Sequence, residues 1–151
     1  MRSLPILPVV AALLSLTLAN ATAAPRPLVP EGWREVPASG EGGERVFVSP
    51  NGVARLTLGH VPAHRGNQER DMDRLMYREG ERITYQRRGG SWLAVSGYRN
   101  GEIFYRKSNL ACRGTRWHTI ELEYPGDAKE PLDPIVTAIA RRMGAYGAEC
   151  G

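Results

Sequence analysis

Between residues 45 and 61 the chain alternates apolar and polar residues, the period of two that predicts β-strands. This stretch, RVFVSPNGVARLTLGHV, contains two alternating runs on either side of Ser49-Pro50-Asn51-Gly52. Proline presets the first turn dihedral and glycine accepts a positive φ, so the pattern predicts a β-hairpin. A shorter strand is expected before it, around residues 33–36.

Four further strand-like runs follow in the second half of the chain. They read RITYQR (82–87), SWLAVSGY (91–98), EIFYRKSNLAC (102–112) and RWHTIELEY (116–124). Their connections are short, and Asn100-Gly101 is the strongest short-range hairpin signal. The runs therefore predict a four-stranded antiparallel meander. Two-residue loops set Tyr98 opposite Ile103, and they set Arg106 opposite Glu121 as a cross-strand ion pair.

Two segments switch to helical spacing. In NQERDMDRLMYREGE the apolar residues recur at intervals of three and four, with Asn67 as N-cap and Gly80 as the end. In the second segment Asp133 is the expected N-cap, Pro134 takes the first helical position and Gly144 ends the helix. Both faces of the meander carry apolar residues, so a helix is expected on each. The predicted fold class is α+β: an antiparallel meander sheet with an N-terminal β-hairpin and two packed helices.

The first 23 residues have the pattern of a secretory signal peptide. Arg2 supplies a positive start, an uncharged apolar run covers residues 4–18, and Ala21-Thr22-Ala23 matches the small-x-small cleavage pattern. A retained signal-anchor is the alternative, but a membrane-spanning helix needs about 20 apolar residues. We therefore expect cleavage after Ala23, a periplasmic or secreted product, and no membrane span after cleavage. A flexible lead-in is expected over residues 24–44, followed by a single domain over 45–151.

The charge of the chain is a mild basic excess. Its formal value of +4 falls to +3 when Arg2 leaves with the signal peptide. An excess of this size does not argue for nucleic acid, and we expect no nucleic-acid partner.

Cys112 and Cys150 are the two cysteines of the chain. An even count in an oxidising compartment predicts one disulfide, which would stabilise the fold by about 4 kcal/mol in the chain-entropy model. The alternatives are a redox pair or two metal ligands. Redox pairs are usually spaced as C-x-x-C, and a metal would need further ligands that no sequence pattern supplies.

The element order resembles a known fold group. A hairpin, a helix, antiparallel strands and a C-terminal helix, with IFYRKSNLACRGTRWHTIELEYP followed by LDPIVTAIARRM, resemble the PsbP-like α/β/α sandwich. This fold occurs in extrinsic photosystem subunits and in small exported proteins of unknown function from alphaproteobacteria. The resemblance implies a binding or assembly module, and it carries no catalytic motif.

Three sets of residues are candidate chemical sites. His60 and His64 have metal-ligand spacing for a helix, but Pro62 lies between them, so no metal or other cofactor is expected. His118 is a candidate base, yet no serine or cysteine nucleophile has a recognisable setting. Glu121 and Glu123 lie on one strand face and cannot straddle a sugar bond without a facing cleft, so Glu121 is assigned to its arginine partner.

Arginines at the ends of the meander are the strongest candidate binding feature. The turns at one end of the sheet carry Arg87, Arg88, Arg113 and Arg116, with Trp117 and Trp92 close by. Arginine and aromatic residues are common at interfaces, and arginine suits carboxylates and phosphates. This basic rim predicts another envelope protein or an anionic ligand as partner.

The sequence thus favours an exported, non-enzymatic binding or assembly domain. The first alternative is a small hydrolase or metal-dependent enzyme that uses His118 or His60 and His64. The second is a small-ligand carrier with an apolar pocket between the sheet and one helix.

Overall fold

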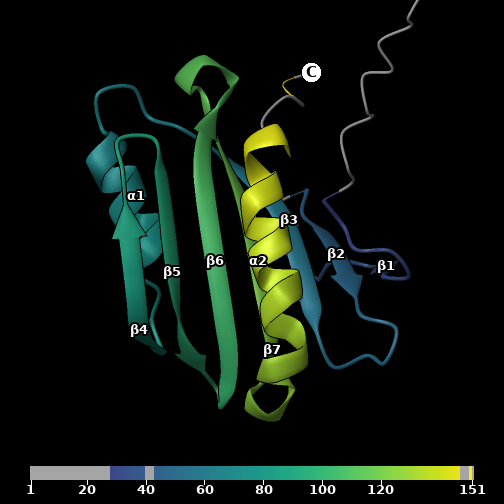
Figure 1. Ribbon diagram of the computed structural model, residues 1–151. Coiled ribbons are helices and arrows are strands. Elements are labelled where there is room, and N and C mark those ends of the chain that lie inside the picture. Colours follow the sequence, from purple (N-terminus) through teal and green to yellow (C-terminus); the bar gives the residue numbers. More distant parts are fainter. Residues whose placement is uncertain (1–27, 40–42, 147–149, 151) are drawn as a thin grey trace, which may run out of the picture.

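The computed structural model describes residues 28–39, 43–146 and 150 of the 151-residue chain. Within these residues the chain forms a seven-stranded sheet, two α-helices and two short 3₁₀ turns (Figure 1). The strands are β1 (Arg34–Val36), β2 (Arg45–Val48), β3 (Arg55–Pro62), β4 (Glu81–Arg88), β5 (Trp92–Arg99), β6 (Glu102–Ala111) and β7 (Arg116–Pro125). The helices are α1 (Gln68–Met76) and α2 (Lys129–Tyr146), and the 3₁₀ turns are η1 (Cys112–Gly114) and η2 (Gly126–Ala128).

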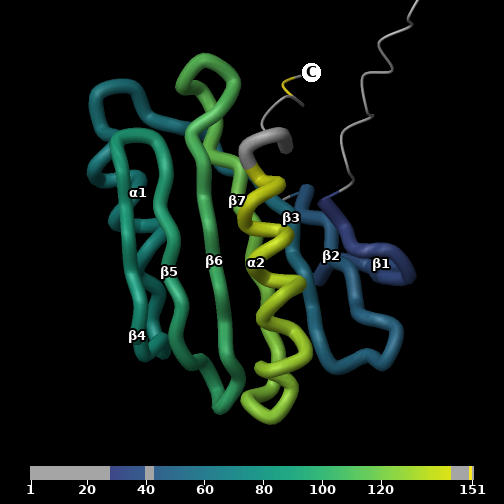
Figure 2. The backbone as a smooth tube through the Cα atoms, viewed as in Figure 1, coloured from purple at the N-terminus to yellow at the C-terminus, as the bar shows by residue number. Residues whose placement is uncertain are grey.

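The strand order is β1-β2-β3-β7-β6-β5-β4, and every neighbouring pair is antiparallel. The chain builds one half of the sheet up to β3 and then crosses through α1 to the opposite edge (Figure 2). From β4 it returns as a meander to β7, which pairs with β3 and closes the two halves into one sheet.

The predicted strands and register are confirmed. The short strand around residues 33–36 is β1, the hairpin is β2–β3, and the meander is β4–β7. Tyr98 pairs with Ile103, and Arg106 pairs with Glu121. An irregularity between Ile83 and Tyr85 shifts the β4–β5 register by one residue. This bulge was not predicted, and it decides which β4 side chains share a face.

Both helix boundaries differ from the prediction. Helix α1 ends at Met76 rather than near Gly80, because the chain becomes extended at Tyr77. Helix α2 begins at Lys129, before the predicted N-cap at Asp133, and an ion pair between these two side chains spans the additional turn. Pro134 therefore lies inside the helix rather than at its first position.

The two helices cover opposite faces of the sheet, as expected from the apolar residues on both faces. Figure 1 shows α2 in front of the sheet and α1 behind it. The core under α2 contains Leu28, Phe47, Ala54, Leu56, Leu58, Ile103, Ile120, Leu122, Tyr124, Leu132, Val136, Ile139 and Met143. The smaller core under α1 contains Met72, Leu75, Met76, Leu93 and Trp117.

Part of the predicted flexible lead-in belongs to the sheet. Strand β1 pairs with β2, Leu28 is buried in the core under α2, and Trp33 packs against that core. The added apolar contacts explain why residues within the 24–44 stretch join the domain predicted to begin at residue 45. The predicted signal peptide, residues 1–23, lies outside the described residues.

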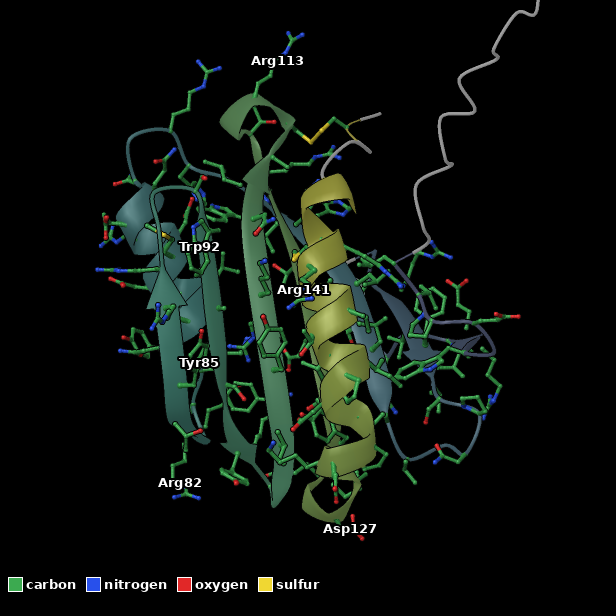
Figure 3. All side chains as sticks on the ribbon, in the orientation of Figure 1. Arg82, Tyr85, Trp92, Arg113, Asp127 and Arg141 are labelled. Atoms are coloured by element: carbon green, nitrogen blue, oxygen red, sulfur yellow. A yellow bond between two sulfur atoms is a disulfide. The ribbon has the colours of Figure 1, made fainter. Side chains whose placement is uncertain are left out.

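The predicted disulfide is present between Cys112 and Cys150. It joins η1, at the β6–β7 turn, to the end of the chain, and Figure 3 shows it beside the loop that carries Arg113. Cys112, Arg113 and Gly114 have φ values of 54°, 55° and 81°, a run of three left-handed residues. The first two are not glycine, so this turn costs about 1–2 kcal/mol for each of them. The disulfide anchors the turn directly at its first residue.

Gly97 gives a test of the β4–β5 packing. A Cβ atom at Gly97 would lie 2.0 Å from the Arg82 carbonyl oxygen and 2.9 Å from Ile83 Cα, so strand β4 would have to move. We expect Gly97→Ala to lower the free energy of unfolding by about 1–3 kcal/mol in urea titrations. Gly90→Ala is the matched control because a Cβ there meets nothing within 4 Å. Equal stability of the two variants would contradict this packing.

Candidate functional site

Helix α2 leaves part of its sheet face uncovered. It contacts β6 and β7, whereas β4 and β5 lie beyond its edge (Figure 1). The register directs aromatic and basic side chains of β4–β6 to this uncovered area. We call the following seven residues the open face: Arg82, Tyr85, Arg87, Trp92, Tyr98, Tyr105 and Lys107. Within the described strands β4–β6, no acidic side chain shares their face, because Glu81 and Glu102 both align with Arg99 on the opposite one.

The aromatic rings of the open face are accessible. Tyr85 is 47% exposed, Trp92 37% and Tyr98 39%. The Arg82 guanidinium lies 4.8 Å from the centre of the Tyr98 ring, a cation–π contact. The Trp92 ring lies against Gly89, where a Cβ atom would come within 2.3 Å of the indole nitrogen. The RRGGSW turn thus makes room for the indole at the edge of the face.

Two shallow grooves continue the open face toward α2. One, of about 290 Å³, is lined by Ser91, Trp92, Lys107, Asn109 and Leu110. The other, of about 280 Å³, is lined by Tyr105, Lys107, Val136, Thr137, Ala140 and Arg141. Lys107 lies between them and donates a hydrogen bond to the Ala140 carbonyl oxygen at 2.9 Å. Figure 3 shows Arg82, Tyr85 and Trp92 on the strands at one edge of the sheet and Arg141 on α2.

Tyr105 keeps its proton in this setting. Burial of the phenol, together with the nearby Tyr85 phenol, raises the pKa of Tyr105 to about 12. Its hydroxyl therefore remains a hydrogen-bond donor across the physiological pH range. Together with the basic side chains, it makes the open face rich in donors.

The predicted basic rim is divided between the two sheet faces. Consecutive strand residues point in opposite directions, so Arg87 lies on the open face while Arg88 turns toward α1. There Arg88 pairs with Glu69 and Asp73, each at 3.2 Å. Arg113 projects from the tip of η1 (Figure 3), and Arg116 lies in β7.

Trp117 is not available to a partner, which corrects its assignment to the rim. It is fully buried in the core under α1, and its indole nitrogen donates to Asp71 Oδ2 at 3.4 Å. Alternation along β7 directs it away from the surface. The exposed tryptophan near the arginines is Trp92, which the sequence placed only beside the rim.

The structure separates His60 from His64. His64 donates its backbone N–H to Asp71 Oδ2 at 2.8 Å, and its ring Nδ1 lies 2.8 Å from Asp71 Oδ1. His60 instead lies in β3 opposite His118, with ring centres 6.4 Å apart. His118 is buried, with Nε2 3.6 Å from Cys112 Sγ. Because that sulfur belongs to the disulfide, it offers no thiol for nucleophilic chemistry.

A buried arginine organises the opposite face. The side chains of Arg106 and Glu81 are 0% exposed, and that of Glu121 is 8% exposed. Arg106 Nε donates to Glu121 Oε2 at 2.8 Å, and Arg106 Nη2 donates to Glu81. Arg106 Nη1 also donates to the Leu75 carbonyl oxygen at 3.0 Å, at the end of α1. A cation is favourable there because helix C-termini carry partial negative charge.

Two outer arginines complete this ion-pair centre. Arg78 donates to Glu121 at 2.8 Å, and Arg99 donates to Glu81 at 2.9 Å as well as to Glu121 and Glu123. Burial alone would raise the pKa of Glu121, but the hydrogen bond and charge of Arg106, with the charges of the outer arginines, outweigh it. The pKa of Glu121 therefore lies below its usual value.

The ion pairs also settle the assignment of the two strand carboxylates. Glu121 and Glu123 are both held by arginine, as the pairing argument predicted for Glu121. A polar cleft of about 230 Å³ adjoins them on the α1 face, between Glu44 and Arg78. The cross-strand pattern predicted only the Arg106–Glu121 pair, because Glu81, Arg78 and Arg99 come from distant parts of the sequence.

Comparison with known proteins supports the architecture. No protein-family model and no curated protein sequence matches the chain. The solution structure of cyanobacterial PsbP (CyanoP) from Synechocystis sp. PCC 6803 aligns with a TM-score of 0.55 and 14% identity. That alignment covers 76% of this chain and 82% of CyanoP. The chain has a PsbP-like fold.

A second solved structure is more distant. LpqN, described as involved in cell envelope biogenesis of Mycobacterium tuberculosis, aligns with a TM-score of 0.46 and 16% identity. The alignment covers 75% of this chain and 78% of LpqN. The PsbP-like fold is thus established by the first comparison, and it agrees with the resemblance found in the sequence.

The ion-pair centre of this PsbP-like fold can be tested by Arg106→Leu. The variant leaves Glu81 and Glu121 buried without their main counter-charge, so we expect it to lose about 3–5 kcal/mol of unfolding free energy at pH 7. Arg82→Leu removes an exposed arginine and is expected to change stability by less than about 1 kcal/mol. Urea titrations of both variants measure the difference.

The pH dependence provides the control for this interpretation. In the native protein the stabilisation from Glu121 is present above its unfolded pKa and is lost as the pH falls through its lowered folded pKa, below about pH 4. In Arg106→Leu the buried Glu121 carboxyl has lost its main counter-charge, so the variant gains stability when this group is protonated. The deficit of the variant should therefore shrink between pH 7 and pH 4. A deficit that is constant with pH would contradict an electrostatic origin.

Proposed function

We propose that the protein is an exported, non-enzymatic binding domain whose open face holds an acidic segment of another envelope protein. The observation that carries this proposal is the composition of the open face, where accessible aromatic rings and basic groups occur together without an acidic side chain from β4–β6. The compartment, the chemistry of the face and its shape each support one part of the proposal.

The disulfide and the N-terminal segment support export. Disulfides persist in oxidising compartments such as the periplasm and are rare in the cytosol. The Cys112–Cys150 bond therefore favours a location outside the cytoplasm, in agreement with the signal-peptide pattern of residues 1–23. Among the described residues, no helix has the length and apolar character needed to cross a membrane.

The residue types of the open face favour a protein partner with acidic groups. Tyrosine, tryptophan and arginine supply most of the binding energy at protein interfaces. Arg82, Arg87 and Arg141 are exposed and Lys107 is half-buried, so four positive charges border the aromatic rings. Complementary charge on a partner would raise the association rate and fix its orientation. Arginine also binds carboxylates through paired hydrogen bonds.

The shape of the face favours an extended segment over a small molecule. Both grooves are shallow, and they share Lys107, so a chain crossing one would continue into the other. A small-ligand carrier would instead need an apolar pocket between the sheet and a helix. An apolar groove of about 410 Å³ lies instead between α2 and residues 29–31.

The proposed export is tested by the intact mass of the protein recovered after expression with its full N-terminus. We expect a mass matching residues 24–151 less two hydrogens, and no thiol alkylation without reductant, because the cysteines are bonded. A Cys112→Ser variant should become alkylated at Cys150, which controls for reagent access. An uncleaved chain, or one with two alkylated thiols, would contradict export into an oxidising compartment.

The proposed binding face is tested with poly-L-glutamate as the acidic probe. We expect saturable binding at 0.1 M salt that weakens toward 1 M salt, since the screening length falls from about 10 Å to about 3 Å. Arg87→Glu combined with Arg141→Glu should lower the affinity at least about tenfold, or about 1.4 kcal/mol.

The matched control reverses the same number of charges elsewhere. Arg70 and Arg74 are exposed on α1, on the opposite side of the sheet. The variant Arg70→Glu with Arg74→Glu has the same net charge as the test variant and should bind nearly as well as the native chain. Equal losses in the two variants would mean that net charge, rather than the open face, determines binding.

A further inference from the structure

The fold brings His118 to the cysteine pair and places His60 beside His118. One ligand atom each from Cys112, His118 and Cys150 lie within 4.8 Å of one another. His60 is the direct strand partner of His118, and its ring centre lies 6.4 Å from that of His118. The sequence contains no spacing that would unite these residues, since β3, β7, η1 and the chain end are far apart along it. Two cysteines and two histidines form a common ligand set for tetrahedral zinc.

The distances fit this geometry. In a tetrahedral site with Zn–S of about 2.3 Å and Zn–N of about 2.0–2.1 Å, the sulfur and nitrogen ligands are about 3.6 Å apart. Cys112 Sγ and His118 Nε2 are 3.6 Å apart. His118 is thus already at ligand distance from one sulfur. His60 is exposed on β3, and its side chain would have to rotate to reach the same point.

The surroundings also suit a thiolate–imidazole site. Asn109 lies opposite His118 on β6, and its Oδ1 is buried without a hydrogen bond among the described residues. A metal-bound histidine usually donates its second ring N–H to an acceptor of this kind.

We propose that the reduced chain binds one Zn²⁺ through Cys112, Cys150, His118 and His60, and that formation of the disulfide removes this site. Reduction by a dithiol or phosphine transfers two electrons to the disulfide, and two protons complete the two thiols. Zinc binding then releases those two protons as the thiolates coordinate the metal. A disulfide oxidant accepts two electrons from the two thiolates and is itself reduced to two thiols, the Cys112–Cys150 bond re-forms and the ion is released, so the same two sulfurs hold either each other or the metal. Oxygen-preferring ions such as Mg²⁺ and Ca²⁺ do not fit this donor set.

The test uses Co²⁺ as a spectroscopic probe on the exported protein, in its disulfide form and after reduction with a phosphine. We expect one equivalent of Co²⁺ to produce thiolate charge-transfer and tetrahedral d–d absorption in the reduced protein only, with Zn²⁺ displacing it. His118→Asn and His60→Ala should each weaken Co²⁺ binding at least about tenfold, since even outer-partner changes cost about 10–100-fold.

His64 is the third histidine of the chain and serves as the matched control. His64→Ala should leave Co²⁺ binding unchanged, because its ring contacts Asp71 away from the cysteines. Absence of Co²⁺ uptake by the reduced protein would overturn the proposal. Equal uptake by the His118→Asn, His60→Ala and native proteins would also overturn it, because the histidines would then not be ligands.

A second measurement covers the case in which reduction or substitution unfolds the chain. Binding to the folded form raises the apparent stability. Zn²⁺ should therefore raise the Tm of the reduced native protein, but not that of the reduced Cys112→Ser/Cys150→Ser variant. If Zn²⁺ does not raise the Tm of the reduced native protein, the site is contradicted, whether that protein is folded or unfolded before Zn²⁺ is added.

Discussion

The fold depends on the buried Arg106 guanidinium. Its hydrogen bonds reach Glu121 on β7, Glu81 at the start of β4 and the last carbonyl groups of α1. Arg106 thus links the crossover helix α1 to β4, where the crossover arrives, and to β7, which pairs with β3. A buried charge of this kind stabilises little by itself, because desolvation offsets the attraction. Its main effect is to specify one arrangement, since any other arrangement leaves charges buried and unpaired.

The two sheet faces have different roles as a result. On the α1 face, arginine and glutamate side chains are bound to one another, and the charges of the ion-pair centre are occupied. On the α2 face, basic groups and aromatic rings lie beyond the edge of the helix with no carboxylate from the neighbouring strands. The proposed binding function follows from this asymmetry: one face is internally satisfied, and the other has donors available for a partner.

Local patterns were enough to predict the strands, the meander register and the Arg106–Glu121 pair. Alternation and the Asn-Gly turn set which residues oppose one another, and these signals lie within a few residues. The assignment of Trp117 to the rim was wrong because the residue, although close to a turn, is pointed into the core by alternation along β7. The α1 end was misplaced because the chain becomes extended at Tyr77, next to the point where Arg106, from a later strand, donates a hydrogen bond to the Leu75 carbonyl oxygen.

Non-local pairing accounts for the features of the fold and site that local patterns did not predict. The alignment of β3 with β7 has no sequence signal, yet it sets His60 beside His118 and completes the sheet. Glu81, Arg78 and Arg99 likewise meet only after the meander has formed. The disulfide was predictable from cysteine count and compartment, whereas the histidines around it required the three-dimensional structure.

The central position of the β3–β7 pair also has a consequence for the order of folding. Leu58 in β3 aligns with Ile120 in β7, so the ribosome completes β2 and β3 long before their inner partner exists. Closing so long a loop is entropically costly, and contacts of this separation form slowly. The meander β4–β7 has the shorter loops and is the expected folding nucleus. The strands synthesised first, β1 to β3, pair with it last. Until then β3 presents an unpaired edge, the kind of surface on which chains associate with one another.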